Sequence, residues 1–196
     1  MPDLGRGFVK SFKQTSSIDD FEFQNLYAGC SKHYEADKIF HASEFFKWGS
    51  KVCVDLLKVT PFQELVERRW FIGHVLFEML LDRILVRHKP KVLSDFYENL
   101  NLADTQTLQK FFILNHSVDI EKFMNFFIHF RRVGYIKNYT DNNLFVYSLN
   151  RLFMRAKLPP LSLYDQVLMQ ECLLFLEDTE FKRVDELLLR LKQVFE

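Results

Sequence analysis

Glycine and proline, the residues that most often interrupt regular structure, number only 6 and 5 in this chain of 196 residues. The long segments between them carry apolar residues three and four positions apart, a spacing typical of α-helices packed against a core. A fold built from many short strands needs more turn residues than this. The sequence therefore predicts an all-α fold, at least two-thirds helical, with no sheet of three or more strands.

Length and hydrophobic content together predict one domain spanning residues 1–196. Hydrophobic residues make up 48% of the chain, which is enough to build one substantial core. Phenylalanine contributes 22 residues, and helices packed through phenylalanine explain this number better than an aromatic ligand site does. We expect a bundle of about seven to eight helices around one long central helix.

Caps and helix breakers set the expected boundaries. A first helix is expected from about Ile18, a break at Gly29, and then a helical stretch to about Val59 that divides near residues 41–44. Thr60 followed by Pro61 is typical of a helix start, so the apolar central helix is expected to begin there. Later helices are expected at 90–101, 105–115, 119–133, 140–156 and 162–195, with Asp119, Thr140 and Ser162 as caps.

Charge and cysteine content exclude several classes of function. The 26 basic and 26 acidic side chains cancel, so no strong field favours nucleic acid or an anionic membrane as a partner. The N-terminus lacks an apolar signal segment, and no apolar run reaches the length of a transmembrane helix. The three cysteines lack metal-site spacing and are expected to be buried reduced thiols: Cys30, Cys53 and Cys172. We expect a cytoplasmic protein.

One row of possible metal ligands consists of His33, Asp37 and His41. On a helix, residues four apart lie about 6 Å further along the axis and about 40° round it, so the three share a face. The outer two are about 12 Å apart in rise and do not reach one ion together. The row therefore predicts a ligand pair, either His33 with Asp37 or Asp37 with His41.

The predicted central helix carries a second row, His74, Glu78 and Asp82, inside the apolar sequence WFIGHVLFEMLLDRIL. Burying an imidazole and two carboxylates costs several kcal/mol unless they are paired, hydrogen-bonded or bound to metal. If the two rows face each other, their nitrogen and oxygen atoms suit Mn²⁺, Fe²⁺ or Zn²⁺. We expect His33, Asp37, His74 and Glu78 to converge within about 5 Å of one point, the range of first-shell metal ligands.

A plainer interpretation of both rows stays open. Polar residues at i and i+4 are common in ordinary helices. Glu78 and Asp82 are also placed to pair with arginines, for which the candidates are Arg69, Arg83 and Arg132. In that case His41 is a surface residue and the rows have no chemical role.

Two segments resemble the motifs of a known family. The segment MPDLGRGFVKSF resembles the motif G-N-x-x-x-D-F-V-K-G, and GCSKHYEADKIFHAS resembles G-I-x-x-H-R-x-I-D-x-F-T-D-x-H. Both motifs belong to the acyl carrier protein phosphodiesterase family, a helical, metal-dependent group related to HD-domain hydrolases. The resemblance matches the family's histidine and aspartate to His33 and Asp37, and its second aspartate to His41. It also places the early aspartate at Asp3.

The same resemblance extends along most of the chain. The family's central D-x-x-x-D-H helix resembles WFIGHVLFEMLLDRIL, with its aspartates at His74 and Glu78 and its histidine replaced by Met79. A later arginine motif resembles NNLFVYSLNRLFMRAKLPP, with Arg151 or Arg155 in the arginine position. Because family members carry a segment before the acidic motif, the resemblance implies that the N-terminal segment is incomplete.

The resemblance implies an HD-domain-like fold and a metal-dependent phosphodiester hydrolase. The implied substrate is acyl carrier protein, from which 4'-phosphopantetheine is released, or another phosphate-bearing molecule. Asp37 or Glu78 would orient the attacking water, and Arg6, Lys10 or Arg155 would neutralise charge on the phosphate. The metal ligands would come from Asp3, His33, Asp37, His41, His74 and Glu78.

Two other functions stay open at this point. The chain is alternatively a catalytically inactive binding module in which the phenylalanine-rich helices over 108–130 offer an apolar groove to a partner protein. A helical dinuclear oxidase uses similar ligands, but the chain lacks the two Glu-x-x-His motifs of that class. The sequence does not fix the metal, the substrate or the oligomeric state.

Overall fold

Helices account for nearly all of the regular structure. The computed structural model describes residues 21–63, 68–114, 119–177 and 182–195. Of these residues 88% lie in helices, and none of them lies in a strand. The predicted all-α class is therefore confirmed.

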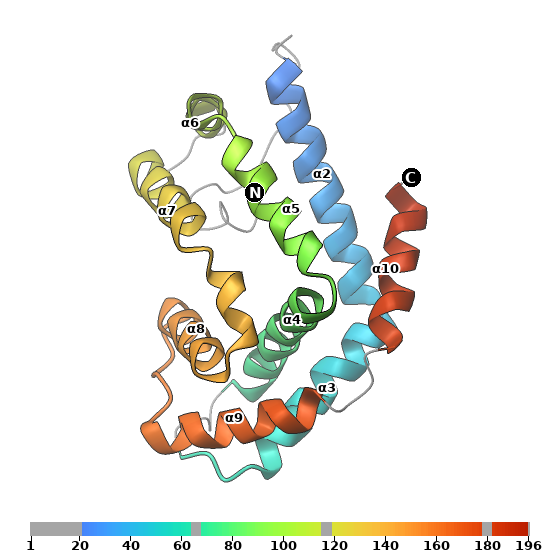
Figure 1. Ribbon diagram of the computed structural model, residues 1–196, viewed down its shortest axis with the longest axis vertical. Helices are drawn as coiled ribbons and strands as arrows, with labels where there is room; N and C mark the ends of the chain where they lie inside the picture. The colour runs from blue at the N-terminus through green and yellow to red at the C-terminus, as the bar shows by residue number, and fades with distance from the viewer. Residues whose placement is uncertain (1–20, 64–67, 115–118, 178–181, 196) are drawn as a thin grey trace. The chain divides into compact units, whose positions relative to one another are not determined.

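The described residues form nine α-helices, labelled as in Figure 1, where the expected number is seven to eight. In chain order the elements are α2 (Phe21–Ala42), α3 (Glu44–Val59), α4 (Arg69–His88), α5 (Pro90–Leu102), α6 (Thr105–Leu114), α7 (Ile120–Val133), the 3₁₀ helix η1 (Tyr135–Thr140), α8 (Asn142–Arg155), α9 (Leu163–Glu177) and α10 (Lys182–Phe195). The predicted 162–195 helix is two helices, α9 and α10, whereas the two segments expected on either side of Gly29 are one, α2.

The chain divides into two compact units. Of the described residues, unit 1 comprises 21–39, 95–114 and 119–134. Unit 2 comprises the described residues within 40–94 and 135–194. Each unit has its own group of buried apolar side chains.

Helix α4 forms the centre of unit 2, where it packs along α3 (Figure 1). Ile72, Leu76 and Leu80 lie along α4 and are almost completely buried. The close approach of the two helices depends on Gly73, because a Cβ atom there would lie 2.5 Å from the Val54 side chain. The expected central helix is therefore present, although it is shorter than expected.

The predicted start of this helix at Pro61 is wrong. Thr60 ends α3, and Pro61–Gln63 is not helical. The Phe62 side chain is buried in the core of unit 2, and the Gln63 N–H donates to Asp165 Oδ1 at 2.9 Å. These contacts with a distant part of the sequence hold the segment in a non-helical conformation despite its helix-start signal.

The predicted break at Gly29 is also wrong, because α2 continues through it. Gly29 is exposed, and a glycine inside a helix costs only about 1 kcal/mol, so it does not have to end the helix. The expected division near residues 41–44 is confirmed at Ser43. There the Ser43 hydroxyl accepts a hydrogen bond from the Phe46 N–H and caps α3.

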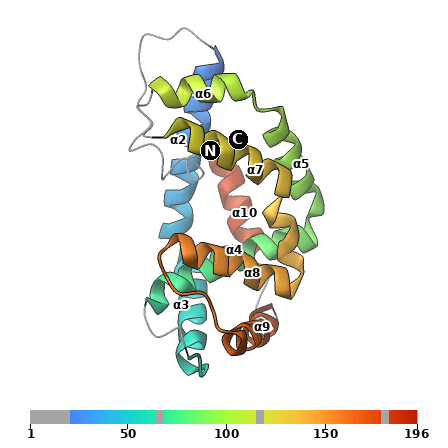
Figure 2. The same ribbon diagram turned by 90° about the vertical axis from the view of Figure 1, so that its left-hand side faces the viewer.

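Two of the three predicted caps are confirmed. Asp119 accepts from the Lys122 N–H at the start of α7, and Ser162 accepts from the Asp165 N–H at the start of α9. For α8 the cap is Asp141, which accepts from the Leu144 N–H, instead of Thr140. Helix α8 lies beside α9 within unit 2 (Figure 2).

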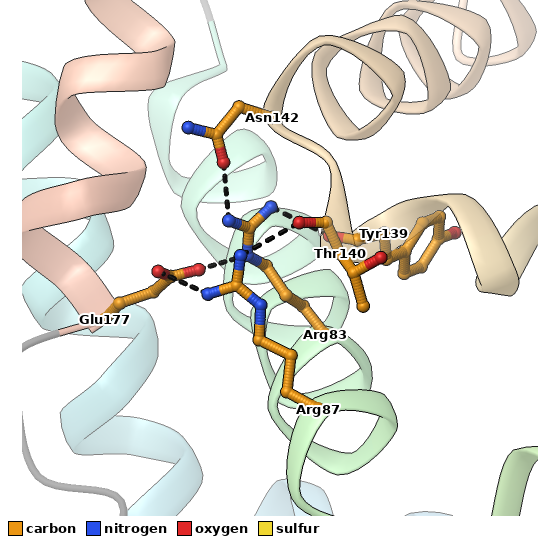
Figure 3. Close-up of polar contacts among 6 residues, drawn as sticks. All are labelled: Arg83, Arg87, Tyr139, Thr140, Asn142 and Glu177. Carbon is orange, nitrogen blue, oxygen red and sulfur yellow. Dashed lines mark hydrogen bonds and ion pairs between the residues drawn. The ribbon is translucent and has the colours of Figure 1, made fainter. Parts of the chain in front are cut away.

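A buried ion-pair network joins α4 to α9 and to the η1–α8 segment (Figure 3). Arg83 is fully buried and pairs with Glu177 through its Nε, while its Nη1 donates to the Tyr139 carbonyl at 2.8 Å. Asn142 Oδ1 accepts from Nη2 of Arg83, and Arg87 reaches the second Glu177 oxygen at 2.6 Å. The single charge of Arg83 thus connects α4 to α9, η1 and α8 within unit 2.

The phenylalanines of residues 108–130 pack mostly within unit 1. Four of them are buried in its core: Phe111, Phe112, Phe123 and Phe127. Phe112 and Phe123 stack with their ring centroids 3.8 Å apart. These four side chains belong to the core of unit 1, and the groove of the binding-module hypothesis stays a prediction.

The cysteines behave as expected, since Cys30, Cys53 and Cys172 are buried free thiols. Burial raises the pKa of the Cys53 thiol to about 12, and nearby Cys172 adds to the effect. Cys53 therefore stays protonated and unreactive at neutral pH. None of the helices that the structure describes is long and apolar enough to cross a membrane.

Candidate metal site

His41, His74 and Glu78 form a cluster of potential metal ligands in unit 2. Glu78 Oε1 lies 3.1 Å from His74 Nε2 and 3.4 Å from His41 Nε2. One ligand atom from each residue falls within 4.8 Å of the other two. Ligand atoms at about 2.0–2.1 Å from a tetrahedral ion lie about 3.3–3.4 Å apart, so the two measured distances suit a shared ion.

The local sequence explains how His41 reaches the cluster. His74 and Glu78 share a face of α4 because they are four residues apart. His41 lies in the last turn of α2, two residues before the break at Ser43. The Ser43 hydroxyl donates to the Phe40 carbonyl at 2.6 Å and accepts from α3, which fixes the end of α2.

Aromatic packing orients the two imidazoles. The rings of His41 and His74 stack with centroids 4.9 Å apart and an interplanar angle of 29°. The buried Phe46 ring contacts both, at 4.4 Å from His41 and 4.7 Å from His74. Phe46 therefore forms an apolar wall behind the ligand atoms, as is common around metal sites.

The cluster is open to solvent. The side chains of His41, His74 and Glu78 are 31%, 29% and 38% exposed. Three protein ligands leave further coordination positions for water or substrate, which is the arrangement of catalytic zinc sites. Two histidines and one carboxylate also suit Fe²⁺. The donor set therefore fits a catalytic ion better than a closed structural ion.

Asp82 extends the α4 row by one further turn and is partly buried. Burial, together with a smaller effect of the negative charge of Glu78, raises the pKa of its carboxyl to about 7. A carboxyl with a pKa near neutral pH can both take up and release a proton during a reaction. The four-residue spacing on α4 predicted Asp82 as a candidate site residue. The spacing did not predict its raised pKa.

Asp82→Asn is expected to remove a pH-dependent loss of stability from the metal-free protein. Between about pH 4 and pH 7 the folded protein keeps a proton on Asp82 that the unfolded chain has released, so stability falls as pH rises through this window. The variant should be more stable than the parent at pH 8 by about 1–3 kcal/mol, with little difference at pH 4. Denaturant unfolding at both pH values measures this, and an equal change at both would contradict the buried carboxyl.

The remaining predicted site residues lie elsewhere or outside the described residues. Asp3, Arg6 and Lys10 belong to residues 1–20, which are outside the described part. His33 and Asp37 are partly buried residues of α2 in unit 1, and the cluster does not include them. Their convergence with His74 and Glu78 stays a prediction.

Two further predictions concern arginines. Arg155 is an exposed residue at the end of α8. Arg83 was one of the arginines considered as a partner of Glu78 and Asp82, yet it pairs with Glu177. Glu78 lies instead against the two histidines. The structure therefore does not support the alternative in which Arg83 pairs with Glu78 or Asp82.

Comparisons of the chain with protein-family models, with curated proteins and with solved structures found no match.

Proposed function

We propose that this chain is a metal-dependent phosphodiester hydrolase that binds one divalent ion at His41, His74 and Glu78. The observation that carries the proposal is the approach of two imidazole nitrogens and one carboxylate oxygen to within 4.8 Å of one another on a solvent-accessible surface. Zinc hydrolases use the same two-histidine, one-carboxylate set. Mn²⁺ and Fe²⁺ suit the same donors.

The chain's own residues supply the other parts of the reaction. A bound divalent ion polarises a phosphoryl oxygen and lowers the pKa of water. Asp82, one turn beyond Glu78 on α4, is a candidate for taking the proton from the attacking water. In this proposal Arg155, Arg6 and Lys10 remain candidates for neutralising charge on the phosphate, and His33, Asp37 and Asp3 remain candidates for a wider ligand set.

A narrower proposal rests on the family resemblance alone. It takes the fold as HD-domain-like and the substrate as acyl carrier protein carrying 4'-phosphopantetheine. The geometry of the cluster supports hydrolysis more directly than it supports this substrate. A generic phosphodiester is therefore the better first test.

Hydrolysis of bis(4-nitrophenyl) phosphate tests the proposal. Metal-stripped protein should become active when Mn²⁺, Fe²⁺ or Zn²⁺ is added, and Glu78→Gln should lose at least about 100-fold in kcat/KM, as removal of a key electrostatic group does. Glu44→Gln is the matched control, because Glu44 is an exposed residue paired with Lys47. Absence of hydrolysis with all three ions would rule out the proposal for simple phosphodiesters.

A further inference from the structure

Helix α9 presents an apolar face to solvent. Its inner side packs in the core of unit 2, where Met169, Cys172 and Leu173 are buried. Six residues of its outer side are exposed, and Glu171 is the charged one among them. The other five are large apolar or aromatic residues that are between 50% and 83% exposed: Leu163, Tyr164, Val167, Leu174 and Phe175. A helix that is apolar on all sides is usually covered on all sides, so this face is expected to have a partner.

These five side chains, called the α9 face below, share one side of the helix. Successive residues of an α-helix turn by about 100°, which places the five within a sector of about 120°. Leu163 and Tyr164 lie at the first end of the face. Leu174 and Phe175 lie at the other end, about 16 Å further along the axis. The α9 face is therefore a straight apolar ridge with a bulky pair of side chains at each end.

The order of residues along this ridge is self-complementary. In a two-fold pair of antiparallel helices, each residue faces the one that lies equally far beyond the symmetry axis. With the axis at the level of residue 169, Leu163 faces Phe175 of the second copy. Tyr164 faces Leu174 of the second copy in the same arrangement. Both bulky ends of the ridge are therefore covered at once, which suits a second copy of this chain as the partner.

The area of the α9 face also suits a dimer. At their exposed fractions, the five side chains show on the order of 500 Å² together. Two copies that cover each other's ridge would bury about 1,000 Å², which is near the lower limit for a specific interface. An interface of this size predicts a weak dimer, with a dissociation constant in the micromolar range.

We infer that the α9 face binds the α9 face of a second copy of this chain, as a two-fold antiparallel pair. Val167, near the middle of the ridge, then faces Glu171 of the second copy. The Glu171 carboxylates of the two copies lie near the axis, so their like charges oppose association. None of these residues belongs to the metal cluster, so the inference does not depend on the proposed function.

Sedimentation velocity of the whole chain tests the inference. At about 200 µM, well above a micromolar Kd, most of the chain should sediment as a dimer, and dilution should release the monomer. A chain that stays monomeric at this concentration would overturn the inference. Flotation of such a monomer with neutral phosphatidylcholine vesicles would instead assign the α9 face to lipid.

Leu174→Asp and Leu189→Asp form a matched pair of variants, because the two leucines are 60% and 58% exposed on different helices of unit 2. Leu174→Asp places a charge in the α9 face and should weaken the dimer at least tenfold. Leu189→Asp places the same charge on α10 and should leave the Kd unchanged. Equal weakening in both variants, or none in Leu174→Asp, would contradict the interface; the melting temperature of each variant shows whether it has folded.

Glu171→Gln tests the antiparallel arrangement. The substitution removes the like charges near the axis at almost constant side-chain size, so it should tighten the dimer at least about threefold. Glu186→Gln is the control, because it removes the same charge from an exposed position of α10 and should leave the Kd unchanged. A Kd that is unchanged or raised by Glu171→Gln would rule out the proposed pairing.

Discussion

Glu177→Leu is expected to lower the free energy of unfolding by about 3–5 kcal/mol, because it leaves the Arg83 charge buried without its counter-ion. Arg83 has only 1% of its side chain exposed, and Glu177 has 16%. The Tyr139 carbonyl and Asn142 Oδ1 still accept from Arg83 in this variant, but neither carries a negative charge. Denaturant unfolding followed by circular dichroism measures the loss.

Two further variants make the Glu177 result specific. Asp185→Asn removes the exposed Lys89–Asp185 ion pair and should cost less than about 1 kcal/mol. Arg83→Met combined with Glu177→Leu removes both buried charges and should recover much of the lost stability. If Glu177→Leu is no more harmful than Asp185→Asn, the Arg83 network does not hold unit 2 together.

The second large effect is expected from Leu76→Asp, at a cost of at least about 3 kcal/mol. Leu76 is fully buried on α4, so the new carboxylate would have to be buried or the helix would have to move. Trp70→Asp is the control on the same helix, because Trp70 is 70% exposed and lies in the first turn, where a carboxylate is tolerated. Its expected cost is about 1 kcal/mol or less.

The same denaturation curves show which outcome holds for Leu76. An unchanged midpoint for Leu76→Asp would mean that α4 is not the centre of its unit. A loss equal to that of Trp70→Asp would have the same meaning. The difference in unfolding free energy between the two variants isolates the effect of burial, because both add the same charge to the same helix.

Local signals in the sequence predicted most of the helices, because spacing and capping act over only a few residues. Asp119 and Ser162 cap helices through their nearest neighbours, and the structure confirms both. Contacts between distant residues were not predictable in this way. Pro61–Gln63 is held out of the helix by a hydrogen bond from Gln63 to Asp165, which lies 102 residues away.

The candidate site also combines features that local sequence predicts with contacts between distant residues that it does not predict. Spacing alone identified the rows that contain His41, His74 and Glu78, since four-residue intervals place side chains on one face of a helix. Spacing did not show which members meet, because this depends on where α2 ends at Ser43. The partner of Arg83 also lay beyond sequence reasoning, since Glu177 is 94 residues away.

Calorimetric titration of metal-stripped protein with Zn²⁺ tests the central claim most directly. We expect one ion per chain and a rise in stability of about 1.4 kcal/mol for each tenfold excess of free ion over its Kd. Binding should be lost in His41→Ala and in Glu78→Gln, and kept in His88→Ala, which changes an exposed histidine at the end of α4. Titrations with Mn²⁺ and Fe²⁺ complete the measurement. No binding of any of the three ions, or equal binding by the parent and the His41 and Glu78 variants, would contradict the metal site.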